Sequence, residues 1–93
     1  MSAPRMTLER RIREKLMVSL QPKRLDVVNE SHMHSGHAGD NGTGQTHFSI
    51  LIVAEAFAGK SRVARHRLVN DALADEFRDG VHALSIKALT VEE

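Results

Sequence analysis

Residues 46–56 read THFSILIVAEA, and this stretch decides the fold of the chain. Ile50, Leu51, Ile52 and Val53 follow one another without a polar residue between them. Because successive side chains of a strand point to opposite faces, this run places apolar residues on both faces, which is typical of the centre of a sheet. We therefore predict a central strand from Thr46 to Ala56.

Upstream of this strand, the sequence predicts one helix and one further strand. Apolar residues recur at every fourth position from Leu8 to Leu20, which is typical of the buried stripe of a helix, and Thr7 can cap its start. Pro22 cannot continue the helix because it lacks an amide hydrogen. From Leu25 to Ser31, the residues alternate between two faces, which indicates a short strand.

Downstream, the sequence predicts a second helix and a last strand. Ser61 can cap a helix from Arg62 to Phe77, after a turn at Gly59-Lys60-Ser61. Gly80 permits the left-handed backbone that often follows a helix. The final strand is predicted from Val81 to Thr90. The apolar stripe of the second helix consists of His66, Val69, Leu73 and Phe77.

The predicted element order is α-β-β-α-β, an α+β fold of the type II KH-like kind. The first two strands can pair antiparallel, whereas the second helix crosses over to leave the last two strands parallel. Both helices then cover one face of a three-stranded mixed sheet. Residues 32–45 lack periodicity and contain four glycines, so we expect a mobile loop there. We expect a single domain over residues 1–93, with a short flexible N-terminus at residues 1–6.

The composition restricts the functions open to the chain. Its 93 residues carry a net charge of +1, so no overall field attracts it to nucleic acid or to a membrane. No apolar run approaches the roughly 20 residues that span a bilayer, and we expect a cytoplasmic protein. No nucleophile elbow, Walker loop or zinc-protease motif occurs, so we expect no enzyme. Asp71, Asp75 and Glu76 are expected to be ordinary surface carboxylates of a helix.

Six histidines and no cysteine are the most informative feature of the composition. A chain without thiolates can bind a soft metal only through histidine or with sulfur ligands from a partner. His82 shares the parity of Leu84 in the last strand, so it is either a core-edge histidine bonded to a backbone carbonyl or a ligand. His34 is either a solvated loop residue or a ligand. His32 and His37 lie in the same loop. His47 has either a structural role or a role as a ligand, and His66 is expected to be packed against the core.

A cationic segment follows the central strand. Its members are Lys60, Ser61, Arg62, Arg65 and Arg67, with no acid among them. This segment is either a solvated helix face or a docking surface for a protein partner or for phosphates. Phosphate binding at the turn of a KH domain uses two glycines, and Gly59-Lys60-Ser61 lacks the second one.

Five motifs occur in the order expected of one known family. They are Asn29-Glu30-Ser31 with His34, Thr46-His47-Phe48, Phe57-Ala58-Gly59-Lys60-Ser61, Arg65-His66-Arg67 and Gly80-Val81-His82-Ala83-Leu84-Ser85-Ile86. Together they make the chain resemble BolA proteins from about Leu8 to Glu93.

The resemblance implies a non-enzymatic protein that forms a heterodimer with a monothiol glutaredoxin and shares a [2Fe–2S] cluster with it and its glutathione. The partner and glutathione supply thiolates in such complexes, and the BolA-like chain supplies histidine. The ligands implied here are His82 and His34, and His37, His32 and His47 are further candidates. The isolated chain, a monomer or weak homodimer, is expected to hold no cluster. The alternative that the resemblance leaves open is a DNA-binding transcriptional regulator that uses the cationic segment.

Overall fold

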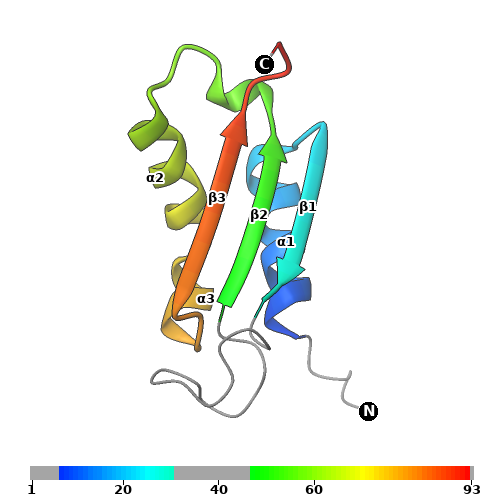
Figure 1. The fold of residues 1–93 in the computed structure, drawn as a ribbon, viewed down its shortest axis with the longest axis vertical. Helices are drawn as coiled ribbons and strands as arrows, with labels where there is room; N and C mark the ends of the chain where they lie inside the picture. The colour runs from blue at the N-terminus through cyan, green and yellow to red at the C-terminus, as the bar shows by residue number, and fades with distance from the viewer. Residues whose placement is uncertain (1–6, 31–46, 93) are drawn as a thin grey trace.

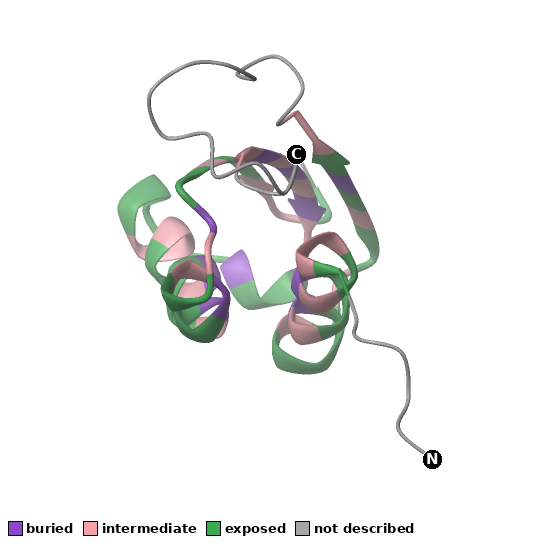
Figure 2. Ribbon diagram, turned by 90° about the horizontal axis from the view of Figure 1, so that it is seen from below, coloured by how far each residue is buried: buried purple, intermediate pink, exposed green. Residues whose placement is uncertain are grey.

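The computed structural model describes residues 7–30 and 47–92. Its strands form one sheet in the order β1-β2-β3, with β1 antiparallel and β3 parallel to β2 (Figure 1). The helices lie on one side of this sheet (Figure 2). The predicted α+β fold with a three-stranded mixed sheet is therefore confirmed. The elements are α1 (Leu8–Leu20), β1 (Arg24–Asn29), β2 (His47–Val53), the 3-10 helix η2 (Glu55–Phe57), α2 (Arg62–Ala72), α3 (Ala74–Arg78) and β3 (Ala83–Leu89).

The first helix has the bounds that the sequence predicts. The Thr7 hydroxyl accepts a hydrogen bond from the Arg10 amide at 3.1 Å, which satisfies one of the free donors at the helix start. Pro22 disfavours right-handed helical backbone at the residue before it, and Gln21 takes a left-handed conformation with φ of 46°. Among the residues that the structure describes, neither this helix nor another is long and apolar enough to cross a membrane.

The core lies between the helices and the inner face of the sheet. Phe48, Ile50 and Ile52 alternate along β2 and are almost completely buried, whereas Leu51 and Val53 on the opposite face are only half-buried. The central position of this strand is confirmed. Although both of its faces carry apolar residues, only the face that meets the helices is fully buried. The helical residues of the core include Ile12, Leu16, Val69 and Leu73.

The predicted second helix is interrupted, which is a correction to the sequence analysis. Leu73 separates α2 from α3 and has φ of −106° and ψ of 18°, values outside the helical range. The stripe itself is confirmed, because Val69 and Leu73 are buried and Phe77 packs against the core. Neither glycine nor proline marks the break, so the local sequence gives no signal of it. The redirected turn brings Glu76 into the interior.

The strand ends also differ from the prediction. β2 stops at Val53, and the predicted continuation to Ala56 instead enters the 3-10 turn, which buries Phe57 completely. β3 begins at Ala83, so His82 comes before the strand rather than within it. The strand therefore begins two positions later than predicted, and His82 lies in the segment that leads into it.

Candidate histidine site

Two histidines meet at the end of the sheet where β2 and β3 begin. In the parallel ladder His47 is the partner of Ala83, which follows His82 directly. The ring centroids of His47 and His82 are 6.3 Å apart, and the ring planes are inclined by 36°. The two imidazoles are therefore neighbours although they come from segments far apart in the sequence.

His82 is exposed, which excludes the interpretation of a core-edge histidine. Val81 before it is buried, and Leu84 two positions later packs against the core, so the backbone on both sides of the ring is fixed. No hydrogen bond joins the His82 side chain to another of the described residues. A ring held by its backbone and open to solvent can bind a metal or a partner without first leaving the interior.

The other histidines are placed differently. His32, His34 and His37 lie outside the described residues, so the proposed loop ligands stay predictions. His66 is half-buried on α2 and lines a hollow beside β3, away from the other two rings, in line with the packed role expected of it.

The donors described at this end of the sheet fit a part of a shared iron–sulfur cluster. Within residues 7–30 and 47–92, no three His, Cys, Asp or Glu side chains gather closely enough to hold a metal ion. The chain has no cysteine, and a [2Fe–2S] cluster bound through histidine still takes thiolates on its other iron. His82 and His47 could contribute imidazole nitrogen, while the sulfur ligands would have to come from another molecule.

A buried acid close to this site was not predicted. Glu76 is fully buried, so its interpretation as a surface carboxylate is wrong. Arg11 of α1 donates from Nε to Glu76 Oε2 at 3.1 Å, and its Nη2 donates to Asp79 Oδ2 at 2.6 Å. Lys15 Nζ lies 3.7 Å from Glu76 Oε1, which accepts no hydrogen bond. The hydrogen bond to Asp79 is the main cause that raises the pKa of Arg11 above its usual value.

Asp75 beside this group gives the fold a measurable dependence on acid pH. A hydrogen bond from Lys15 Nζ at 3.2 Å, helped by the charges of Lys15 and Arg78, lowers the pKa of Asp75 below its usual 3.8. A pKa lowered by folding contributes stability above the unfolded value that is lost as pH falls through the folded value. The free energy of unfolding should therefore fall below about pH 4, and less steeply in Asp75→Asn.

Urea unfolding followed by circular dichroism, from neutral to acid pH, checks this expectation. Asp71→Asn is the matched control, because Asp71 is exposed and forms no ion pair with any described residue. Equal acid sensitivity of Asp75→Asn and the wild-type chain would contradict the assignment.

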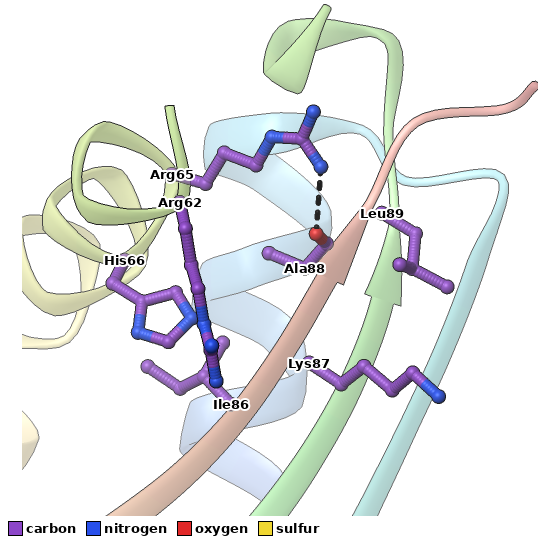
Figure 3. A pocket seen from close by; sticks show the side chains of 7 residues that line it. All are labelled: Arg62, Arg65, His66, Ile86, Lys87, Ala88 and Leu89. Carbon is purple, nitrogen blue, oxygen red and sulfur yellow. Dashed lines mark hydrogen bonds between the residues drawn. The ribbon is translucent and has the colours of Figure 1, made fainter. Parts of the chain in front are cut away.

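The cationic segment borders a hollow of about 510 Å³ between α2 and β3 (Figure 3). Arg65 is half-buried and donates from Nε to the Lys60 carbonyl and from Nη1 to the Ala88 carbonyl, both at 3.0 Å. It thus ties the start of α2 to the edge strand. Lys60, Arg62 and Arg67 are exposed. The predicted binding segment therefore divides into one structural arginine and three accessible cations.

The fold and this site define a small α+β domain with an exposed imidazole at one end of its sheet and exposed cations at the start of α2. The chain belongs to the BolA-like family, whose model, described as BolA-like protein, matches residues 16–93. The family that the motifs indicate is thereby confirmed.

Individual relatives agree with this assignment. Over 82 residues the chain is 46% identical to the DNA-binding transcriptional regulator BolA of Vibrio cholerae, covering 88% of this chain and 74% of that one. Over 87 residues it is 52% identical to SufE-like protein 1, chloroplastic/mitochondrial, of Arabidopsis thaliana, covering 89% of this chain but only 24% of that one. The solved BolA domain of SufE1 from Arabidopsis thaliana matches with a TM-score of 0.84 at 47% identity, covering 96% of this chain and 98% of that chain.

Proposed function

We propose that this chain is a non-enzymatic partner of a monothiol glutaredoxin and supplies histidine to a [2Fe–2S] cluster that the two proteins share. The observation that carries the proposal is His82, an exposed ring on a fixed backbone, next to His47 in a chain without cysteine. The resemblance to BolA proteins supports the choice of partner. The role would lie in cluster assembly, cluster delivery or the response to iron.

In this proposal His82 is a ligand and His47 is either a second donor or the group that orients the first ring. Imidazole in place of thiolate raises the reduction potential of a [2Fe–2S] centre. Only neutral imidazole can ligate, so acid that protonates the ring competes with the metal. The glutaredoxin and its glutathione supply the thiolates. His34, with His32 and His37, remains a candidate for a loop ligand.

The test is to reconstitute the chain with a monothiol glutaredoxin, glutathione, iron and sulfide without oxygen. We expect a stable pair whose visible absorption and circular dichroism differ from those of the glutaredoxin homodimer carrying its own cluster. A mixture whose spectrum is the same as that of the homodimer would refute the shared site.

A second candidate function is binding of DNA by the accessible cations Lys60, Arg62 and Arg67. The hollow beside them is lined by further cations and by no acidic side chain, and one relative is named a DNA-binding transcriptional regulator. Each phosphate contact releases counterions, so affinity that depends on these side chains should fall steeply with salt.

A mobility-shift titration at two salt concentrations tests this function. Arg62→Glu and Arg67→Glu should weaken binding and reduce the salt slope by about one per lost phosphate contact. Arg65 is unsuitable for the test, because its loss would free two backbone carbonyls and disturb the fold. Lys23→Glu, exposed before β1, is the matched control. Binding that is equally weak in all variants would exclude the segment.

A further inference from the structure

The buried carboxylate of Glu76 has no part in the function proposed above, yet it lies on the segment that leads to His82. Its contacts come from α1, at the opposite end of the chain. Arg11 Nη2 lies 2.9 Å from Glu76 Oε2 and also reaches Asp79 in the turn after α3. We call these contacts of Arg11 with Glu76 and Asp79 the Arg11 clamp.

A buried ion pair such as that of Glu76 with Arg11 is better explained by the geometry it imposes than by a gain in stability. Taking a carboxylate and a guanidinium out of water costs free energy that their attraction repays only with good geometry, and apolar residues of similar volume often stabilise a fold as well. Here one carboxylate oxygen has no hydrogen bond, so the pairing is incomplete. The clamp joins α3 and the turn after it to α1.

The clamp is linked to the backbone next to His82. The main-chain carbonyl of Glu76 accepts a hydrogen bond from the Val81 amide at 3.1 Å. Gly80 between them has φ of 138°, a conformation that glycine adopts readily, and it lets the chain fold back. The side chains of Glu76 and Asp79 therefore anchor the turn to Arg11. The Glu76 carbonyl closes the turn by accepting the hydrogen bond from Val81, the residue before His82.

We propose that Glu76 is a positioning residue, and that the Arg11 clamp holds the turn so that the His82 imidazole is presented for ligation beside His47. The inference rests on the proposed function, because it assigns a purpose to the clamp only if His82 binds metal. Glu76 itself touches no ligand. Its effect passes through the Val81 hydrogen bond and the backbone of the turn.

The test uses the full chain, free and paired with the glutaredoxin. In the free chain, hydrogen exchange of the Val81 amide reports whether the turn is held. In the pair, the visible circular dichroism and the reduction potential report histidine ligation. Glu76→Gln removes the charge and nearly conserves the shape, and Arg11→Lys keeps a cation facing the carboxylate. Both are compared with Glu14→Gln, which changes an exposed carboxylate on α1 whose one ion pair within the described part of the chain is with Arg10 at 3.4 Å.

We expect Glu76→Gln to accelerate Val81 exchange and to shorten the lifetime of the shared cluster about ten-fold, the usual scale for groups that orient ligands. Arg11→Lys should change both measurements in the same direction but less, and Glu14→Gln should resemble the wild-type chain. Should Glu76→Gln not fold, Asp79→Asn takes its place, since it removes one arm of the clamp at an exposed site. It should change both measurements in the same direction.

Two results would overturn the inference, and they are distinguishable. If the wild-type pair shows a histidine-dependent spectrum and Glu76→Gln and Asp79→Asn behave like Glu14→Gln, the positioning role is wrong while the proposed function stands. If the wild-type pair shows no such spectrum, the proposed function fails and the inference fails with it.

Discussion

His82→Ala is expected to remove the histidine-dependent part of the spectrum from the pair formed with a monothiol glutaredoxin. The ring is exposed and makes no hydrogen bond to the described residues, so its removal should leave the fold and the apo contact between the proteins nearly unchanged. Metal ligation should be lost, and the cluster should revert to the signature of the glutaredoxin homodimer. Absorption, circular dichroism and the iron content of the isolated pair measure this.

The control is His66→Ala, which removes another imidazole, half-buried on α2 and distant from the site. It should keep the mixed spectrum. His47→Ala distinguishes the two roles proposed for its ring. If His47 is a ligand, its own contribution to the spectrum should disappear. If it orients His82, the histidine-dependent spectrum should only become weaker. A His82→Ala pair with the wild-type spectrum and iron content would show that the ligand lies elsewhere.

Phe57→Ala is expected to cost about 3–5 kcal/mol of unfolding free energy, the usual range for deletion of a buried aromatic ring. Small domains have roughly 5–15 kcal/mol in total, so the variant should be largely destabilised or unfolded near body temperature. The ring is fully buried at the 3-10 turn, where it joins the end of β2 to the core. Chemical unfolding followed by far-ultraviolet circular dichroism gives the value.

Val63→Ala is the comparison for this prediction. Val63 lies on α2 and is 62% exposed, so its truncation leaves no cavity and should change stability by less than about 0.5 kcal/mol. A Phe57→Ala variant as stable as Val63→Ala would mean that the core does not depend on the ring.

The parts of the fold that could be predicted are those that the local sequence determines. The four-residue spacing from Leu8 to Leu20 and the Thr7 cap fix α1 to its observed bounds. The two faces of β1 follow from alternation, as Val27 shows by its burial and by its pairing with Ile50, whereas the apolar run of β2 predicts a central strand without saying which of its faces is buried. Each of these signals acts over a few residues, and no distant partner is needed to make it correct.

The parts that were missed depend on contacts between distant segments. Glu76 has a helical surface pattern in the sequence, and its burial is made tolerable by Arg11 and Lys15, which come from the other end of the chain. The break at Leu73 likewise has no local marker. For His82, parity with Leu84 left open a core-edge histidine or a ligand, and the sequence could not decide between them. In the structure β3 begins at Ala83, two residues later than predicted, and His82 before it is exposed.

The parallel pairing of β3 with β2 means that folding has to precede the binding of a ligand by both histidines. His47 and His82 become neighbours only after the last strand has docked, and contacts between segments so distant in sequence form late because closing the intervening chain costs entropy. A ligand that binds both rings therefore binds the folded protein and not the nascent or unfolded chain. A ligand that binds only the folded state stabilises it by mass action, so binding to both rings would also stabilise the pairing of β3 with β2.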